Sequence, residues 1–291
     1  MMKRLWIYLS EMYPLTSWLG TSLMGFMVLT LAWRLSESTS FAWQTLTAAL
    51  TLCFFSLLIR VMDEFKDFED DKKNYPNRPL PSGRVKKSDL ILLGWTCVGM
   101  GLVLSLWDRG VLLMAVAVLG FSFLMLKWFF FEAPIRRSLP LALATHHPIV
   151  LLHFGYVLAA HQATGHSLTT FQMVSILPLV AMMTNWEFCR KIRAPKDETA
   201  YTTYSKIWGP RPAMAVALVL QVVVLVTGLN LLNQMGLVLV WGVVFTIGYL
   251  FLMTPMLNFF GTLTTIRPLK FWAEQQVLWT VLFLIIAGWW G

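Results

Sequence analysis

Nine long apolar runs constrain the fold of this chain more than any other feature. A transmembrane helix needs about 20 mostly apolar residues, and runs near that length cover residues 14–33, 41–62, 89–107, 110–131, 139–160, 171–189, 212–232, 236–256 and 271–290. Charged residues make up only 13% of the sequence, against about 25% in soluble domains. We therefore predict an all-α polytopic membrane protein, with nine transmembrane helices in a bundle and a single domain over residues 1–291.

The distribution of basic residues predicts the orientation of these spans. Residues 5–13 are amphipathic and aromatic, as in a short helix at the membrane interface. With the N-terminus in the cytoplasm, 21 of the 23 Lys and Arg residues fall in cytoplasmic segments, and only Arg34 and Arg109 fall outside. This bias follows the positive-inside rule, so the net charge of +8 requires no nucleic acid partner. The absence of eukaryotic targeting features favours a bacterial inner membrane.

The first polar cluster follows the second apolar run directly. Asp63, Asp67 and Asp71 are four residues apart, which places them on neighbouring turns of one helical face, with Glu64 beside them. Like charges at this spacing repel each other. A hard cation such as Mg²⁺, which prefers oxygen ligands and bridges carboxylates to phosphates, would reverse that cost.

A solvated loop is the simpler interpretation of this cluster, because Lys66, Lys72 and Lys73 could neutralise the acids in pairs. Two observations favour a binding site instead. The acids begin at the mouth of a hydrophobic span, and basic residues that suit an anion follow them, namely Arg78, Arg84, Lys86 and Lys87. Acids for a metal beside bases for phosphate are what a diphosphate site needs.

A second polar cluster lies at the end of the sixth predicted span. Arg190 and Lys191 follow Glu187 at the spacing of helical ion pairs, so Glu187 is either one half of an interfacial ion pair or a site residue. Arg193, Asp197 and Glu198 continue the cluster, on the same predicted side of the membrane as the first. Ala194-Pro195 is expected to break the helix between them.

These two clusters resemble those of the UbiA superfamily of intramembrane prenyltransferases. The family's first motif, N-D-x-x-D-x-x-x-D, is matched in spacing by Asp63-Glu64-Phe-Lys-Asp67-Phe-Glu-Asp-Asp71. Its H-R-P-x-P-S-G tail is matched by Asn77-Arg78-Pro79-Leu80-Pro81-Ser82-Gly83. The stretch 203–209, which contains Tyr204, looks like the helix start of the family's second motif. The acids of that motif, however, are reduced here to Asp197, Glu198 and Glu187, and Arg190-Lys191-Ile192-Arg193 adds positive charge.

The resemblance implies a role for each of these residues. Mg²⁺ would be bound by Asp63, Glu64, Asp67, Asp71, Asp197 and Glu198. Glu187 and Tyr204 are possible further residues of the site. The diphosphate would be bound by Arg78, Lys72, Arg190, Lys191 and Arg193. Asp63, Asp67, Asp71 and Arg78 would carry catalysis. Because positive charge replaces acid in the second motif, one bound Mg²⁺ and two both remain open.

The implied reaction is transfer of a prenyl group from a prenyl diphosphate to a lipophilic or aromatic acceptor in the membrane, with release of pyrophosphate. A terpene cyclase on the same scaffold is the alternative, since it would ionise the same substrate and trap the cation within the chain. A transporter is a third interpretation. It would carry ionisable or broken-helix features near mid-membrane, whereas the acids of this chain gather at one face.

Overall fold

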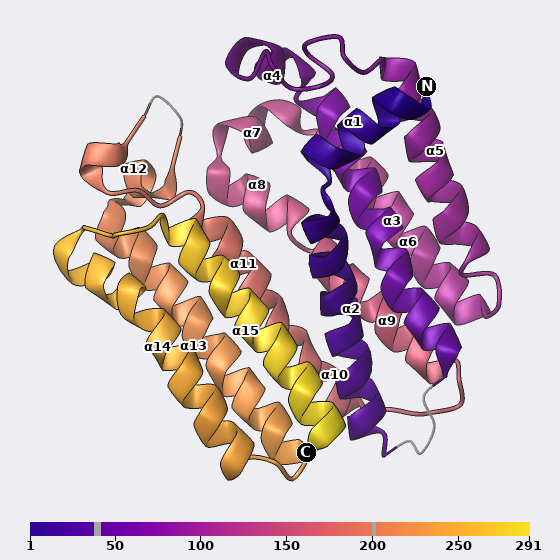
Figure 1. Ribbon diagram of the computed structural model, residues 1–291, viewed down its shortest axis with the longest axis vertical. Helices are drawn as coiled ribbons and strands as arrows, with labels where there is room; N and C mark the ends of the chain where they lie inside the picture. Colours follow the sequence, from indigo (N-terminus) through magenta and orange to yellow (C-terminus); the bar gives the residue numbers. More distant parts are fainter. Residues whose placement is uncertain (38–41, 200–201) are drawn as a thin grey trace. The chain divides into compact units, whose positions relative to one another are not determined.

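A computed structural model describes residues 1–37, 42–199 and 202–291 of the protein. Every regular element in these ranges is a helix, and none is a strand (Figure 1). In order, the elements are α1 (Met2–Met12), α2 (Leu15–Leu35), α3 (Trp43–Lys66), α4 (Phe68–Asn74), α5 (Lys87–Val103), α6 (Arg109–Leu126), η1 (Trp128–Phe130), α7 (Glu132–Arg137), α8 (Leu139–His146), α9 (Ile149–Gln162), α10 (Thr170–Ile176), η2 (Leu177–Leu179), α11 (Val180–Cys189), η3 (Pro195–Asp197), α12 (Tyr204–Trp208), α13 (Pro210–Gln234), α14 (Val240–Thr262) and α15 (Leu269–Trp290). The predicted all-α fold is confirmed, and the short helix predicted at 5–13 corresponds to α1.

Within the described part of the chain, seven helical segments are long and apolar enough to cross a membrane, namely α2, α3, α6, the α8–α9 pair, α13, α14 and α15. Their outer faces carry exposed apolar side chains, such as Val219 and Val226 on α13 and Phe251 on α14. Contiguous apolar surface of this kind is expected against lipid and is rare on soluble monomers. The chain is an integral membrane protein.

Seven of the nine predicted spans meet this criterion of length and hydropathy within the described residues. The runs 89–107 and 171–189 fall on α5, which has only 17 residues, and on the consecutive elements α10, η2 and α11. Pro178 lies in η2, and a proline inside a helix removes one backbone hydrogen bond. The start of the second predicted span, at residue 41, lies outside the described residues.

Two other predicted spans are interrupted where the backbone leaves the helix. The run 110–131 ends as a helix at Leu126, because Trp128, Phe129 and Phe130 adopt φ angles of 50°, 51° and 62°. The run 139–160 is divided between α8 and α9 on either side of His147 and Pro148. Apolar composition alone predicted both runs as continuous, and it carries no information about these turns.

The described chain forms two compact units. The first contains α1, α2 as far as Leu29, α3 to α6, η1, α7 as far as Ile135, and α9 from Leu152. The second contains the remaining parts of α2, α7 and α9, together with α8 and α10 to α15. Whether the whole chain is one functional domain stays a prediction.

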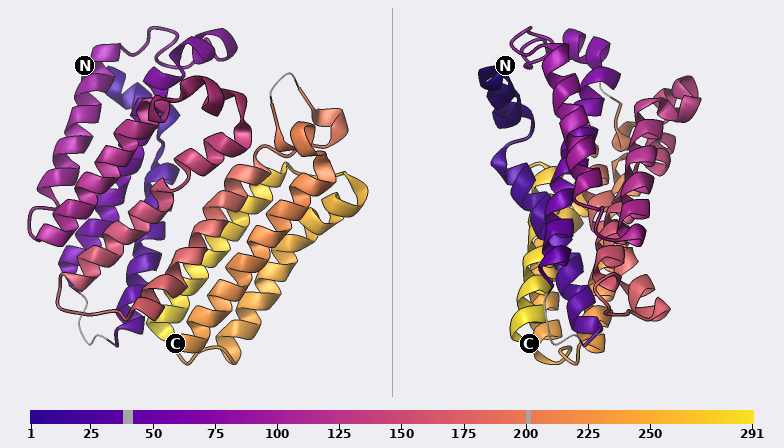
Figure 2. Two further views of the ribbon diagram at one scale, coloured as in Figure 1. Left: turned by 180° about the vertical axis from the view of Figure 1, so that it is seen from behind. Right: turned by 90° about the vertical axis from the view of Figure 1, so that its right-hand side faces the viewer.

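The first unit is built on α3, which packs along α5 and contacts α6 (Figures 1 and 2). Phe55 of α3 is fully buried, and its ring centroid lies 5.2 Å from that of Tyr156 on α9. The Tyr156 hydroxyl shares a hydrogen bond of 2.8 Å with Ser105. This packing holds α3 in place, and the first polar cluster begins at its C-terminal end.

The second unit is a bundle in which α11, α13, α14 and α15 pack together (Figures 1 and 2). A chain of buried amides crosses it. Asn185 donates to Gln276 Oε1 at 3.4 Å, and Gln276 donates to Gln221 Oε1 at 3.0 Å. These hydrogen bonds satisfy buried amide groups that water does not reach. The second polar cluster follows α11, at one end of this bundle.

Candidate active site

The backbone keeps Asp63, Asp67 and Asp71 in helical register across a break. The α3 helix ends at Lys66, Asp67 has φ −102° and ψ 11°, and α4 begins at Phe68. Even so, the amide of Asp67 donates to the carbonyl of Asp63 at 2.8 Å, and the amide of Asp71 donates to the carbonyl of Asp67 at 2.8 Å. The three residues therefore follow one another at successive turns, as their spacing predicts.

The motif tail returns to the same place through a compact loop. The amide of Val85 donates to the carbonyl of Pro79 at 3.0 Å, and Gly83 turns the chain with φ 77°, a value that favours glycine. Arg84 then binds both carboxylate oxygens of Glu11 on α1, at 2.5 and 2.9 Å. This exposed ion pair joins the loop to α1.

Basic side chains of the same unit form ion pairs with Asp63, Glu64 and Asp71. The pairs are Lys66–Asp63 at 3.1 Å, Arg60–Glu64 at 2.5 Å and Arg78–Asp71 at 2.5 Å. Glu64 is almost wholly buried, and the side chain of Asp71 is 10% exposed. Asp67 is half-buried between them, and Lys72 is exposed on α4. The structure shows ion pairs at Asp63, Glu64 and Asp71, whereas a shared site that includes Asp67 and Lys72 stays a prediction.

Two buried oxygens at this cluster lack a hydrogen-bond partner among the described residues. One is Oε2 of Glu64, and the other is the hydroxyl of Tyr8 on α1. Burial and the neighbouring Glu64 carboxylate raise the pKa of Tyr8, so its hydroxyl keeps its proton. Tyr8 could not be predicted as part of the site, because it lies more than fifty residues before the motif on a helix predicted only from its amphipathic pattern.

An aromatic residue in a strained backbone segment also reaches the cluster. The ammonium group of Lys66 lies 4.5 Å from the ring centroid of Trp128, the first of three residues with positive φ. Such angles are unfavourable for bulky residues and concentrate at functional sites. Lys66 therefore contacts both the Trp128 ring and the Asp63 carboxylate.

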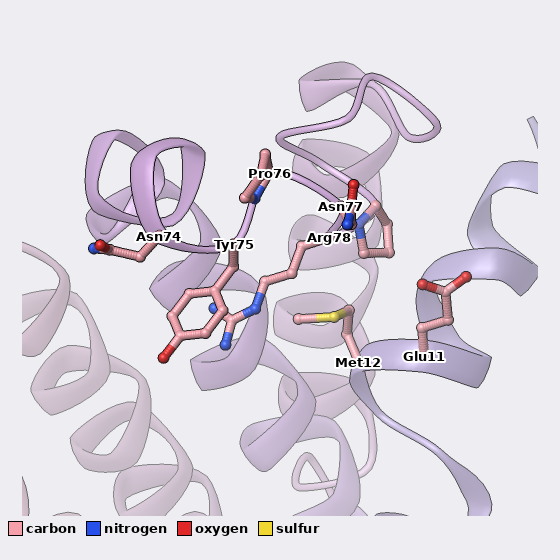
Figure 3. A pocket seen from close by; sticks show the side chains of 8 residues that line it. Glu11, Met12, Asn74, Tyr75, Pro76, Asn77 and Arg78 are labelled. Atoms are coloured by element: carbon pink, nitrogen blue, oxygen red, sulfur yellow. The ribbon is translucent and has the colours of Figure 1, made fainter. Parts of the chain in front are cut away.

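A pocket of 430 Å³ opens beside Arg78 (Figure 3). Its lining residues are Glu11 and Met12 of α1, Asn74 of α4, and Tyr75, Pro76, Asn77, Arg78 and Pro79 of the tail. The Arg78 guanidinium carbon lies 4.1 Å from the ring centroid of Tyr75, and Figure 3 shows the two side chains running together along the wall. This pocket lies entirely within the first unit.

The second polar cluster contains an ion triplet at the C-terminal end of α11. Glu187 accepts from Arg190 at 2.5 and 2.8 Å, and its Oε1 also lies 2.9 Å from the Lys191 ammonium. Both carboxylate oxygens of Glu187 are therefore engaged by cations three and four residues on, as the spacing predicts. Arg190 is exposed and Lys191 is half-buried.

The loop after α11 is closed by Glu198. Its carboxylate accepts from the Thr203 hydroxyl at 2.9 and 3.0 Å and from the Ser205 hydroxyl at 2.6 Å. Ser205 in turn accepts from the Arg193 amide at 2.9 Å, and the Arg193 side chain donates to Thr199 at 2.7 Å. These contacts hold the loop together and occupy Glu198.

The two remaining candidates of the second motif lie apart from this network. Asp197 is exposed in η3. Tyr204 is fully buried, with its ring centroid 4.0 Å from that of Phe188 and an interplanar angle of 3°, and its hydroxyl donates to the Leu139 carbonyl at 3.4 Å. Tyr204 therefore packs in the core of the second unit.

The first cluster fits a metal better than the second. Among the described residues, no three His, Cys, Asp or Glu side chains are already arranged around one metal position. The first cluster nevertheless offers the four motif carboxylates among the six acids of residues 63–71, and Oε2 of Glu64 is buried and without a partner among the described residues. Such a donor set suits a hard divalent cation. In the second cluster, the protein's own donors engage both Glu187 and Glu198.

Fold and site together define a polytopic helical membrane protein with two acid–base clusters at helix ends. Comparison with known families identifies it further: residues 18–260 match the UbiA prenyltransferase family, and the chain belongs to that family. The resemblance inferred from the two motifs is confirmed. Comparison with functionally curated proteins gives no match.

Two solved structures share this fold. A structure of digeranylgeranylglyceryl phosphate synthase in membranes is 17% identical with a TM-score of 0.66, and the alignment covers 98% of this chain and 99% of that one. The apo structure of a UbiA homologue from Aeropyrum pernix K1 is 14% identical with a TM-score of 0.67, and it covers 92% and 96% of the two chains. Family membership decides against the transporter interpretation.

Proposed function

We propose that this protein transfers a prenyl group from a prenyl diphosphate to a lipophilic or aromatic acceptor within the membrane, with Mg²⁺ bound at the first cluster. The observation that carries the proposal is the junction of four carboxylates and Arg78 at the end of the apolar helix α3. Membership of the UbiA prenyltransferase family supports the reaction class.

In this proposal Asp63, Glu64, Asp67 and Asp71 hold the metal through carboxylate oxygens. Bound Mg²⁺ supplies positive charge that stabilises the diphosphate as it departs. The carbon–oxygen bond to the diphosphate breaks, the oxygen keeps the electron pair, and an allylic cation remains. A nucleophilic carbon or oxygen of the acceptor then attacks this cation and loses a proton to the solvent or the leaving group.

Arg78 is proposed to bind the diphosphate beside the metal, with Lys72 as a further cation. In the second unit, Arg190, Lys191 and Arg193 are proposed as further cations that bind a diphosphate group. Arg190 and Lys191 share the single carboxylate of Glu187, so their charge exceeds that of their partner. Asp197 remains a candidate ligand for a second ion. Glu198 fits that role poorly, because Thr203 and Ser205 already donate to its carboxylate.

We also propose that the N-terminus and both clusters face the cytoplasm, in the inner membrane of a bacterium. Thiol labelling can test this orientation, because Cys53, Cys97 and Cys189 are all buried and give little background. A cysteine replacing Lys72 should react with a membrane-impermeant reagent only after the cytoplasmic face is opened. Labelling of intact cells would overturn the orientation.

The proposed reaction is tested on purified protein in detergent with Mg²⁺ and geranyl, farnesyl or geranylgeranyl diphosphate. Pyrophosphate release and organic products are followed with and without aromatic and lipid acceptors, and EDTA serves as the control. Release that requires both Mg²⁺ and an acceptor supports the transferase. Release without acceptor, together with a cyclic hydrocarbon or alcohol, would move the assignment to a cyclase. No release under any condition would overturn the proposed function.

A further inference from the structure

The first cluster carries its own counter-ions. Asp63, Glu64 and Asp71 pair with Lys66, Arg60 and Arg78, respectively. The first two pairs are three and four residues apart on α3, so they are local helix contacts. The Arg78–Asp71 pair differs, because Arg78 reaches Asp71 from the loop beyond α4. Its formation depends on how the tail folds.

The geometry of Arg78 leaves most of its donors unused. Nη1 donates to both carboxylate oxygens of Asp71 at 2.5 Å. Neither Nε nor Nη2 has a hydrogen-bond partner among the described residues. Guanidinium groups bind carboxylates and phosphates most strongly through two parallel hydrogen bonds. A single nitrogen between two oxygens is therefore an incomplete contact, and it leaves donors for a second anion.

Arg78 also has space in which to change partner. Its side chain is 33% exposed, whereas that of Asp71 is 10% exposed. The 430 Å³ pocket lies against Arg78 and Tyr75 (Figure 3). The guanidinium stacks on the Tyr75 ring, and such a contact can be kept while the group turns within the plane of the ring.

We propose that Arg78 is an exchangeable counter-ion: it neutralises Asp71 while the metal is absent and moves to the diphosphate when Asp71 binds the metal. This inference rests on the proposed function of the first cluster. It makes the metal and Arg78 competitors for one carboxylate, and it makes Asp71 and the diphosphate competitors for one guanidinium. Reciprocal coupling between metal and diphosphate binding follows from that arrangement.

The first test titrates Mg²⁺ alone into detergent-purified protein by isothermal titration calorimetry. Arg78→Ala should strengthen Mg²⁺ binding by about fivefold to tenfold, because the metal no longer displaces a cation from Asp71. Arg84→Ala is the matched control. It removes the same charge from the same loop, but Arg84 pairs with Glu11 outside the cluster, so its effect should stay within about twofold. Arg78→Gln provides a second variant should the alanine variant fail to fold.

The second test uses pyrophosphate in excess EDTA and a change in Asp71. Asp71→Asn should strengthen metal-free pyrophosphate binding by about fivefold to tenfold, because Arg78 is no longer held. Asp70→Asn is the control, since it removes the same charge from an exposed position on α4. Arg78→Ala should therefore bind Mg²⁺ more tightly, and Asp71→Asn should bind pyrophosphate more tightly. Loss of a ligand-binding residue alone cannot produce tighter binding.

The outcomes separate this inference from the proposed function. If turnover requires Mg²⁺ but Arg78→Ala and Arg78→Gln bind Mg²⁺ no more tightly than Arg84→Ala, the exchange is overturned and the transferase assignment stands. The exchange is equally overturned if Asp71→Asn binds pyrophosphate no more tightly than Asp70→Asn. If the wild-type protein binds no Mg²⁺ and releases no pyrophosphate in its presence, the proposed function itself fails.

Discussion

Two glycines on α5 allow a direct test of the packing that holds the first cluster in place. A Cβ added at Gly101 would lie 2.4 Å from Cε1 of Phe55 on α3, whereas a Cβ added at Gly99 meets nothing within 4 Å. Carbon atoms in contact sit about 3.5–4.0 Å apart, so the ring of Phe55 would have to move by more than about 1 Å. That ring is fully buried, with the rings of His153 and Tyr156 beside it.

The magnitude follows from two opposing terms. Overpacking a core lowers the free energy of unfolding by about 1–3 kcal/mol. Replacing glycine by alanine within a helix raises it by about 0.5–1 kcal/mol. We expect Gly101→Ala to lower the free energy of unfolding by about 1–2 kcal/mol and Gly99→Ala to raise it by about 0.5–1 kcal/mol. Thermal unfolding in detergent should separate the two variants by about 4–8 °C. Equal melting temperatures would refute the described packing of α5 on α3.

Three further predictions concern single contacts. Because the hydrogen bond from Arg84 lowers the pKa of Glu11, the pair stabilises the protein above the ordinary glutamate pKa of 4.5, and this stabilisation is lost as the pH falls through the lowered pKa. The melting temperature of Glu11→Gln should therefore fall less than that of wild type when the pH is lowered through this range. In a double-mutant cycle, the losses of stability caused by Glu198→Ala and Ser205→Ala should not add, because the two side chains share a hydrogen bond. Additive losses would show that this hydrogen bond does not stabilise the loop. Tyr8→Phe removes a buried hydroxyl that has no hydrogen-bond partner among the described residues, so the melting temperature should stay the same or rise. Mg²⁺ binding should weaken about tenfold, because groups around metal ligands support them; unchanged affinity would exclude such a role for Tyr8.

The helical fold could be predicted because each membrane span has to satisfy its own backbone hydrogen bonds. The predicted ends were less accurate where polar residues continue a helix. The α14 helix runs six residues beyond the predicted end at 256. Its last residue, Thr262, is polar, but its hydroxyl donates a hydrogen bond of 2.8 Å to the Asn258 carbonyl of the same helix. The breaks at Pro148 and Pro178 had a signal in the sequence, since proline cannot donate a backbone hydrogen bond.

The candidate site was predictable as a set of residues but not as a set of contacts. Spacing placed Asp63, Asp67 and Asp71 together because helical geometry is local. The Arg78–Asp71 pair depends on a loop whose path is fixed by tertiary contacts, and Tyr8 reaches the cluster only through the packing of α1. No local pattern encodes such contacts, so the sequence alone could not distinguish a carboxylate that is available from one, such as Glu198, that is already engaged.

The most direct test of the central claim compares two charge-removing variants near the break between α3 and α4. Asp67→Asn removes a proposed metal ligand, and Glu69→Gln removes an exposed carboxylate two residues away. Prenyl product and pyrophosphate are measured against Mg²⁺ concentration. We expect Asp67→Asn to lose about a hundredfold or more in turnover, while Glu69→Gln stays within about twofold of wild type. An Asp67→Asn variant that turns over at the wild-type rate, with the same Mg²⁺ dependence, would contradict a metal-dependent transferase site at the first cluster.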